Sequence, residues 1–345
     1  MRIGIPREVK DGEYRVALSP SGIRNLSNVV VEPGAGQGVG FSDEEYRQAG
    51  ASLGDPWECD LVVKVKELQE SEYAKPRPGQ TVFGFQHFGP HRELLDAALA
   101  SGATFIAYET VGEAGGRLPI LAPMSAIAGR LAVQLGAWCL LRQNGGSGVL
   151  LPGLDGVAPG KVVIVGAGNV GSNALAVAHG IGARVAVFAR TDKRFASLKR
   201  RYRDVEFVAA KPDILDADLV IAGVLTPGQM SPKLISREML RAMRRGSAFV
   251  DVGIDQGGVA ETSRPTSHSA PTYIEEGVVH YCVPNMPAAC ARTASLALER
   301  AVLPFVLKLI GNQIDGDLAT GIQVKAGKVT HEHLARDTGR AYSRL

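Results

Sequence analysis

Residues 161–174 read KVVIVGAGNVGSNA, and this stretch decides the fold class. An apolar strand, Val162 to Val165, runs into the pattern G-x-G-x-x-G, and a helical pattern follows to about His179. A second apolar strand, Arg184 to Phe188, comes next. In this setting the first glycine permits a tight turn, the second lets a pyrophosphate approach the backbone, and the third lets the helix pack on the strand. The stretch therefore predicts a dinucleotide-binding α/β domain.

The rest of the chain repeats this alternation of short apolar runs with helical patterns. Such an alternation predicts mostly parallel, doubly wound sheets. A long helical pattern from Ala294 to Leu309, which Pro304 should kink or interrupt, returns the chain to where it began. We predict two Rossmann-like domains with a cleft between them. Residues 1–120 and 291–345 form a discontinuous substrate and catalytic domain, and residues 121–290 form the dinucleotide-binding domain.

Composition excludes several classes of protein. The 345 residues include 38 Lys and Arg against 35 Asp and Glu, a balance that predicts no nucleic-acid partner. Residues 118–141 are long and apolar enough to span a membrane, but Arg130 and Gln134 near the centre favour a buried helix. The N-terminus lacks the apolar core of a signal peptide, and the four cysteines form no CxxC pair. We expect a cytoplasmic protein with no membrane partner.

The end of the second strand bears on which dinucleotide binds. An acidic residue there accepts hydrogen bonds from the ribose in NAD sites, whereas an arginine nearby accommodates the 2′-phosphate of NADP. Here Ala189 stands where the acid would be, and it is followed by Arg190 and Thr191, with Arg194 close behind. This composition favours NADP(H), with NAD(H) possible. In the competing interpretation, Asp192 replaces the missing acid and the basic residues face solvent.

Four polar residues follow predicted strands or stand in polar loops: Arg15, Lys66, His87 and Asp255. Loops at the carboxyl ends of parallel strands form the ligand sites of such folds. Each residue also has an ordinary structural explanation, such as a solvated arginine, a strand-end lysine or a turn-forming aspartate. His87 and His91 are four residues apart, but Pro90 between them disfavours a helical metal-binding pair. No metal site is predicted.

Seven segments, in chain order, resemble the alanine dehydrogenase and pyridine nucleotide transhydrogenase family. They are GIPREVKDGEYRVALSP, DLVVKVKE, VFGFQHFG, LPILAPMSAIAGRLAVQLGA, VGAGNVGSNAL, VDVGIDQGG and VPNMPAACARTAS. The resemblance extends from residue 1 to about residue 335. It implies an NAD(P)-dependent amino acid dehydrogenase that reductively aminates a small 2-oxo acid through an imine. It also implies a homo-oligomer, either a dimer or a hexamer.

The resemblance also implies roles for individual residues. Arg15 would clamp the carboxylate of the oxo acid, Lys66 would bind its carbonyl oxygen, and His87 would be the general acid and base at that oxygen or the derived amine. Asp255 would be a second acid and base, during ammonia addition and water loss. Further substrate-binding candidates are Asn285, Met124 and Gln86. The cofactor-binding candidates are Ser125, Gly166, Gly168, Asn169, Val170, Gly171, Ala189, Arg190, Thr191, Arg194, Val224, Leu225, Asp255, Asn285 and Met286.

Departures from the family pattern keep alternatives open. The strand-end acid is missing at Ala189, and Gln86 and Phe88 flank His87 where the family usually has leucines. Gln86 could point away from the site or bind a substrate larger than pyruvate. One alternative is an NADPH-dependent imine reductase of the carboxyethyl-ornithine synthase or opine type, which joins an oxo acid to the amine of another amino acid. Alternatives of another class are a non-catalytic dinucleotide-binding protein and a soluble piece of a membrane transhydrogenase.

Overall fold

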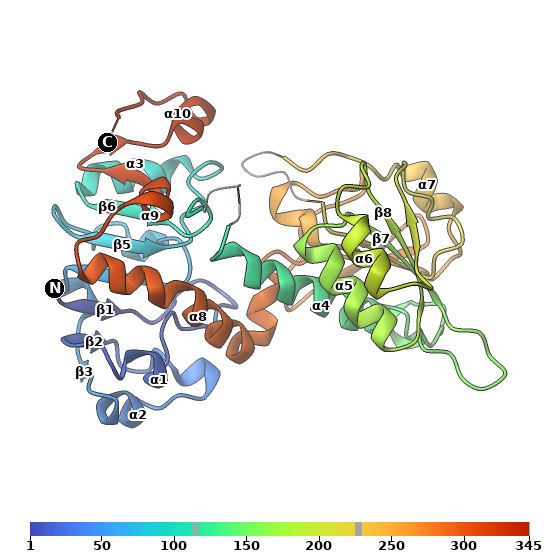
Figure 1. Ribbon diagram of the computed structural model, residues 1–345, viewed down its shortest axis with the longest axis horizontal. Coiled ribbons are helices and arrows are strands. Elements are labelled where there is room, and N and C mark those ends of the chain that lie inside the picture. Colours follow the sequence, from blue (N-terminus) through green and yellow to red (C-terminus); the bar gives the residue numbers. More distant parts are fainter. Residues whose placement is uncertain (113–115, 117, 225–229, 345) are drawn as a thin grey trace. The chain divides into compact units, whose positions relative to one another are not determined.

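The structure, a computed structural model, describes residues 1–112, 116, 118–224 and 230–344 (Figure 1). It divides into two compact units. Unit 1 comprises Met1–Met124 and Ala288–Leu345, and unit 2 comprises Ser125–Pro287. Each unit is a doubly wound α/β fold, as predicted. The chain leaves unit 1 within one helix and returns just ahead of another, a few residues from the predicted boundaries.

Unit 1 contains an eight-stranded sheet in the order β15-β14-β6-β5-β4-β1-β2-β3. The six strands from β6 to β3 are parallel, and β14 and β15 add an antiparallel edge. The strands are β1 (Ile3–Ile5), β2 (Val29–Val31), β3 (Ser52–Leu53), β4 (Leu61–Val63), β5 (Thr81–Gly84), β6 (Thr104–Ala107), β14 (Ile322–Lys325) and β15 (Lys328–Val329).

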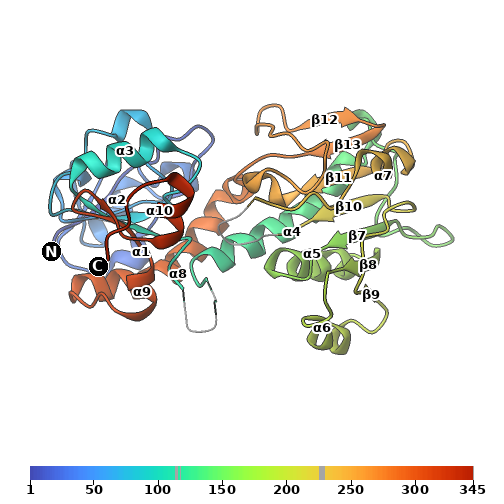
Figure 2. The ribbon, with the colours of Figure 1, turned by 90° about the horizontal axis from the view of Figure 1, so that it is seen from above.

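Helices cover both faces of this sheet, and Figure 2 shows α3 and α8 on opposite sides of it. The helices of unit 1 are α1 (Pro20–Ile23), α2 (Asp43–Gln48), α3 (Arg92–Ser101), α8 (Ala291–Ile310), α9 (Gly316–Thr320) and α10 (Glu332–Thr338). On the α3 face, Leu94 and Leu95 pack with Val62, Val82 and Phe105 in one buried cluster. The predicted interruption at Pro304 is wrong, because α8 continues through this residue for its full 20 residues.

Unit 2 contains a seven-stranded sheet in the order β12-β13-β11-β10-β7-β8-β9. All neighbours are parallel except β12 and β13. The strands are β7 (Lys161–Val165), β8 (Arg184–Phe188), β9 (Glu206–Val208), β10 (Leu219–Ala222), β11 (Ala248–Asp251), β12 (Thr272–Glu275) and β13 (Val278–Tyr281). The helices are α4 (Leu121–Cys139), which begins in unit 1, α5 (Asn169–Gly180), α6 (Phe195–Arg201) and α7 (Arg237–Ala242).

Both sheets contain the strand order 3-2-1-4-5, which a further parallel strand extends, β6 in unit 1 and β13 in unit 2, although their antiparallel edges differ. In each, the first and fourth strands in chain order lie side by side, so that β1 neighbours β4 in unit 1 and β7 neighbours β10 in unit 2. The order 3-2-1-4-5-6 is that of dinucleotide-binding folds, which bind ligands beyond the carboxyl ends of the strands where the order reverses. The topology therefore gives each unit one such edge.

The helix α4 occupies the apolar stretch tested above for a membrane span. It packs closely within unit 2, where a Cβ on Gly129 would lie 2.1 Å from the backbone oxygen of Val170. Among the helices of the described residues, none combines the length and apolar character that a bilayer crossing requires.

Candidate active site

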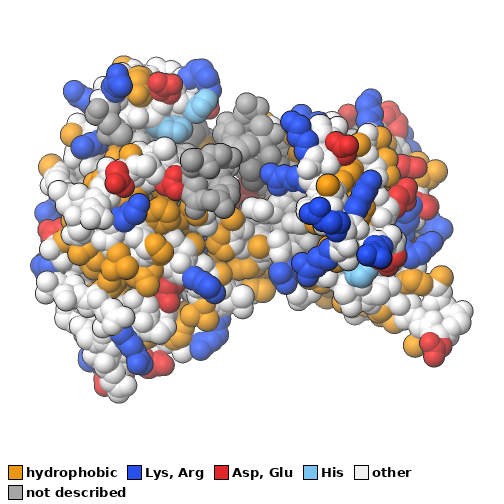
Figure 3. Space-filling model, in the orientation of Figure 1, with side chains coloured by type: hydrophobic (Ala, Val, Ile, Leu, Met, Phe, Trp, Pro, Cys, Tyr) orange, Lys and Arg blue, Asp and Glu red, His pale blue; other side chains and the backbone are white. Residues whose placement is uncertain are grey.

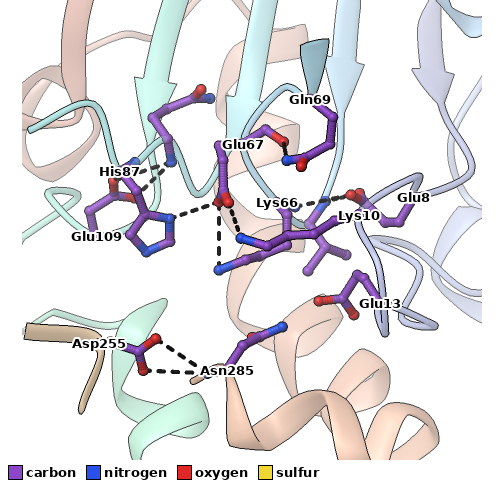
Figure 4. A network of polar contacts seen from close by, with 12 residues as sticks. Glu8, Lys10, Glu13, Lys66, Glu67, Gln69, His87, Glu109, Asp255 and Asn285 are labelled. Atoms are coloured by element: carbon purple, nitrogen blue, oxygen red, sulfur yellow. Dashed lines mark hydrogen bonds and ion pairs between the residues drawn. The ribbon is translucent and has the colours of Figure 1, made fainter. Parts of the chain in front are cut away.

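Polar side chains gather at the carboxyl ends of the strands of unit 1, around Glu67 (Figure 4). The Glu67 carboxylate bonds to His87 Nδ1 at 2.9 Å and lies 3.6 Å from Lys66 Nζ. Lys10 Nζ forms a third, short contact with it. Lys66 and Glu67 follow β4, and His87 follows β5, so neighbouring parallel strands bring these residues together. The sequence predictions for Lys66 and His87 thus fall within one network.

Glu67 is ionised in this network. Burial alone would raise the pKa of this carboxyl, which is 4% exposed, but the hydrogen bond to His87 and the charge of Lys66 outweigh burial and hold the pKa well below its ordinary value. The network therefore places a fixed negative charge against one imidazole and two lysine ammonium groups.

The backbone of His87 has an unusual conformation. Its φ of 48° lies in the left-handed region, which non-glycine residues rarely adopt. Glu109, which follows β6, accepts the His87 N–H at 2.7 Å and the Gln86 N–H at 3.2 Å. The ring of Phe85 stacks on the imidazole with 5.6 Å between centroids. These contacts stabilise one position of the side chain, and strained residues held this way are common at functional sites.

Arg15 is 2% exposed and pairs with a carboxylate two residues before it. Its Nε lies 2.7 Å from Glu13 Oε1, its Nη2 lies 2.5 Å from Glu13 Oε2, and its Nη1 lies 3.2 Å from Met124 Sδ. Glu13 in turn acts electrostatically on Glu8, whose carboxylate accepts the backbone N–H of Lys66 at 3.3 Å. One buried carboxylate thus orients Arg15, and a second binds the backbone of the Lys66 segment.

A fully buried ion cluster lies beside this network. Lys64 Nζ is 2.9 Å from Glu72 Oε2 and 3.5 Å from Glu8 Oε2. Burial raises the pKa of Glu8 to about 7, although the charge of Lys64 opposes this shift. Burial alone would lower the pKa of Lys64, but Glu8 and Glu72 outweigh it and raise that pKa. Lys64 is therefore a charged residue of the interior, whereas Lys66 belongs to the network around Glu67.

The side chain of Gln86 is buried. It is 1% exposed, and both its amide atoms are buried without a hydrogen-bond partner. Its backbone N–H, as described, bonds to Glu109. A substrate-binding role for Gln86 stays a prediction.

The glycine pattern of unit 2 has the geometry that a dinucleotide requires. Gly166 has a φ of 109°, and a Cβ on Gly171 would lie 1.8 Å from the Gly166 oxygen. Gly168 precedes α5, which begins at Asn169, and the nearest atom to a Cβ built on Gly168 is Arg194 Nη1, at 3.6 Å. There is no room for a side chain at Gly171, whereas the space beside Gly168 is open. The N-terminus of the 12-residue helix α5 lies next to the turn. These residues fit a pyrophosphate.

Basic side chains follow β8, and one of them, Arg194, lies near the glycine turn. Arg190 and Thr191 are exposed just past β8, and the exposed Arg194 precedes α6, which ends in Lys199, Arg200 and Arg201. Figure 3 shows Lys and Arg side chains gathered over the part of unit 2 that carries α6. Ala189 directly follows β8, which ends at Phe188, and Asp192 is exposed. The carboxyl end of β8 therefore carries a positive surface.

Asp255 and Asn285 are in contact within unit 2. The Asn285 N–H lies 3.2 Å from one carboxylate oxygen of Asp255, which is exposed, and Asn285 has a φ of 57°. The segment that carries Asp255 is anchored by the buried Asp251, which accepts the N–H groups of Gly253 at 3.0 Å and Val259 at 2.7 Å. Two polar candidates from distant parts of the sequence thus meet in one place.

The remaining candidates differ in exposure. Met286 and Met124 are buried, whereas Ser125 and Val224 are half-buried. Asn169 is exposed and Val170 is buried at the start of α5. Leu225 lies outside the described residues.

Comparisons with known proteins agree with this geometry. The family model "Alanine dehydrogenase/PNT, N-terminal domain" matches residues 4–128, and "Alanine dehydrogenase/PNT, C-terminal domain" matches residues 132–332. The chain belongs to the alanine dehydrogenase/PNT family. The alanine dehydrogenase of Halomonas elongata is 46% identical, over 99% of this chain and 98% of that protein. That of Bacillus subtilis is 43% identical, over 99% and 96%.

Solved structures support the same assignment. A structure of L-alanine dehydrogenase superimposes with a TM-score of 0.95 at 44% identity, covering 98% of this chain and 99% of that one. A transhydrogenase from Sinorhizobium meliloti gives 0.82 at 26% identity, covering 96% and 99%. Membership of the alanine dehydrogenase/PNT family, expected from the sequence, is confirmed, and it implies a pyridine nucleotide cofactor.

Sequence reasoning missed the carboxylates of the site. Glu13, Glu67 and Glu109 all contact residues that were singled out, yet none was itself a candidate. A signal was present, because Glu67 directly follows Lys66 and Glu109 follows the apolar run of β6. Both stand at the carboxyl end of a parallel strand, where ligand sites form.

Proposed function

We propose that the protein catalyses the reversible, NAD(P)-dependent reductive amination of pyruvate to alanine, with Arg15, Lys66 and His87 binding the oxo acid and Asp255 assisting. The observation that carries this proposal is the network around Glu67, in which Lys66 and His87 share one ionised carboxylate. Full-length identity of 41–46% to alanine dehydrogenases supports the substrate.

The residues of unit 1 handle the oxo acid. Arg15, buried and oriented by Glu13, pairs with the substrate carboxylate, since a guanidinium suits planar, charge-assisted hydrogen bonds. Lys66 donates to the carbonyl oxygen and stabilises the negative charge that develops there. His87 gives a proton to this oxygen during ammonia addition, because histidine exchanges protons near neutral pH.

Asp255 acts on the nitrogen. Ammonia adds to the carbonyl carbon to form a carbinolamine, which loses water to form an imine. Asp255 takes a proton from the nitrogen as it adds, while His87 protonates the oxygen. His87 then takes up a proton from solvent and gives it to the hydroxyl, which leaves as water, so that the imine keeps its second N–H proton. When bound, the nicotinamide supplies the hydride that reduces the imine carbon. The Asn285 N–H bonds to the Asp255 carboxylate and orients it.

The positive surface at the end of β8 supports a preference for NADPH over NADH. A ribose-binding acid is absent at Ala189, while Arg190, Thr191 and Arg194 supply donors that suit a 2′-phosphate. Gly166 and Gly168 would let the pyrophosphate lie against the N-terminus of α5, and Gly171 lets this helix pack closely on the turn.

The cofactor preference predicts an unequal effect of one substitution. Arg190→Ala weakens NADPH binding by about 10-fold or more, the worth of one charge-assisted hydrogen bond, and changes NADH binding by much less. Fluorescence titration of both reduced nucleotides measures this. The control is Arg203→Ala, which removes another exposed arginine from unit 2. Equal losses for both nucleotides with Arg190→Ala would argue against the phosphate contact.

The reaction itself is tested by cofactor oxidation with pyruvate and ammonia. We expect turnover with ammonia, and we expect His87→Asn and Asp255→Asn each to lower kcat by about 100-fold or more. Turnover only when ornithine replaces ammonia would instead indicate an amine-condensing imine reductase. Binding of NADPH without turnover on any oxo acid would indicate a binding protein.

We also propose a homo-oligomer in the cytoplasm. Family membership supports the first, and four cysteines in the thiol form support the second, because thiols persist in reducing compartments. Light scattering of the purified protein measures the mass of the assembly against the 36.4 kDa chain, and a monomer would refute the oligomer.

A further inference from the structure

We propose that Glu67 is a positioning residue that keeps a proton on Nδ1 of His87, so that Nε2 is the nitrogen that exchanges protons with the substrate. This inference rests on the proposed function, because it assigns the atom through which His87 acts.

The hydrogen-bond chemistry of Glu67 carries the assignment. His87 Nδ1 and Glu67 Oε2 are 2.9 Å apart, so one of the two atoms donates a proton. A carboxylate that is ionised can only accept hydrogen bonds. Lys10 contacts Oε1 of Glu67, and Lys66 Nζ lies 3.6 Å from Oε2, the oxygen that bonds to His87. These two positive charges keep the carboxylate ionised. The donor is therefore Nδ1–H.

The tautomer of the ring follows. A neutral imidazole carries one N–H, so a proton on Nδ1 leaves Nε2 with the lone pair. The hydrogen bond to Glu67 selects Nδ1 as the nitrogen that faces the carboxylate, and Phe85 stacks on the ring in this orientation with an interplanar angle of 19°. Glu109 fixes the backbone of the same residue. The His87 side chain is 38% exposed whereas that of Glu67 is 5% exposed, so the exchange with substrate takes place away from Glu67.

Glu67 thus links two functional groups of the proposed site. When Nε2 takes up a proton, the imidazolium gains a hydrogen-bonded counter-ion within 3 Å of Nδ1. The same carboxylate oxygen faces Lys66. Glu67 therefore positions both Lys66, which binds the carbonyl oxygen, and His87, which protonates that oxygen. Such orienting partners fix a reactive histidine in other enzymes.

The tautomer can be measured directly in the unmodified protein. The chain has seven histidines, and ¹⁵N labelling of them with correlation to the ring protons distinguishes protonated from unprotonated nitrogens. The signals of His87 are those lost in His87→Asn. We expect the neutral ring of His87 to carry its proton on Nδ1, and a proton on Nε2 would overturn the proposal. This result does not depend on turnover, so it stands apart from a failure of the proposed reaction.

Kinetics supply the second test. Glu67→Met removes the acceptor, and we expect kcat to fall by about 100-fold while KM for the oxo acid changes by less than about fivefold. Glu67→Gln keeps an oxygen that can accept the Nδ1 proton and should retain more activity than Glu67→Met. Equal kcat values in these two variants would contradict a positioning role.

A matched control separates this role from general damage. Glu70→Met makes the same change on an exposed side chain three residues away, and it should leave kcat and KM unchanged. Thermal unfolding of all variants is recorded first. If Glu67→Met unfolds below the assay temperature, the tautomer of the wild-type ring decides the proposal alone.

Discussion

The most constrained residue of the site is His87, which is held from three directions. Glu67 bonds to its ring, Phe85 stacks on the ring, and Glu109 accepts its backbone N–H while φ is 48°. A left-handed conformation at a residue with a Cβ costs of the order of 1–3 kcal/mol, and surrounding contacts must stabilise it. Glu109 supplies one of these contacts, and it also accepts the backbone N–H of Gln86.

This account predicts the effect of removing the Glu109 carboxylate. Glu109→Ala leaves the N–H groups of Gln86 and His87 without their acceptor, and we expect the free energy of unfolding to fall by about 1–3 kcal/mol. We expect kcat to fall by about 10-fold to 100-fold, since His87 is displaced. Urea unfolding and steady-state assays measure the two effects. Glu109→Gln keeps one acceptor and should lie between the wild type and Glu109→Ala; a variant with wild-type kcat would show that the clamp has no catalytic role.

Sequence reasoning works unevenly at this scale. It singled out Lys66 and His87, because a charged or titratable residue at the end of an apolar strand is conspicuous. It missed Glu67 and Glu109, because their importance comes from contacts between strands that are distant in the sequence. The left-handed backbone of His87 and the pairing of Arg15 with Glu13 depend likewise on tertiary contacts, and no local pattern reports them.

Elements are better determined by local sequence than contacts are. The strand β7, the glycine turn and α5 were expected from residues 161–174 and occur there. The antiparallel edge formed by β14 and β15 was not expected, because two short strands in a polar C-terminal segment give a weak periodic signal. Pro304 was expected to kink or interrupt α8, and the helix is not interrupted there, so tertiary packing of this helix outweighs the lost hydrogen bond.

The packing of α5 on β7 predicts the effect of one methyl group. In Gly171→Ala the new Cβ would lie 1.8 Å from the Gly166 oxygen, a backbone atom that can move only if the turn opens. We expect destabilisation by about 1–3 kcal/mol and loss of tight nucleotide binding. Gly180→Ala is the matched control, since nothing lies within 4 Å of its Cβ at the other end of the same helix. It should stabilise by about 0.5–1 kcal/mol and leave binding unchanged. If both variants bind nucleotide equally well, the close packing of Gly171 on the turn is not needed for nucleotide binding.

At the scale of the whole molecule, two units with the same order of parallel strands carry different halves of the chemistry. In unit 1 the carboxyl ends of β1, β4, β5 and β6 carry acids, lysines and a histidine. In unit 2 the corresponding edge carries glycines and is flanked by basic residues. The topology determines where each site lies, and the loop sequences determine its chemistry. The fold was therefore predictable from the alternation of strands and helices, whereas the roles of the site residues required the family resemblance.

The buried cluster of Lys64, Glu8 and Glu72 predicts how the stability of unit 1 depends on pH. Burial raises the pKa of Glu8 from an ordinary 4.5 to about 7. A raised carboxyl pKa means that the folded state keeps a proton that the unfolded state releases. This contribution to stability is complete below the unfolded pKa and is lost as pH rises through the folded pKa. Glu8→Gln cannot titrate and should escape that loss.

The measurement uses one tryptophan in each unit, of which Trp57 is buried in unit 1 and Trp138 lies in unit 2. In a Trp138→Phe background, urea unfolding followed by Trp57 fluorescence reports on unit 1. We expect the free energy of unfolding of Glu8→Gln, relative to its parent, to rise between about pH 5 and pH 8 by at most about 1.4 kcal/mol per pH unit. Glu8→Gln can also weaken the hydrogen bond from the Val65 N–H. Because glutamine does not titrate, that loss lowers the free energy of unfolding of the variant by the same amount at every pH and does not produce a pH-dependent difference. A difference that does not change with pH would mean that Glu8 is ionised throughout and that Lys64 compensates its burial.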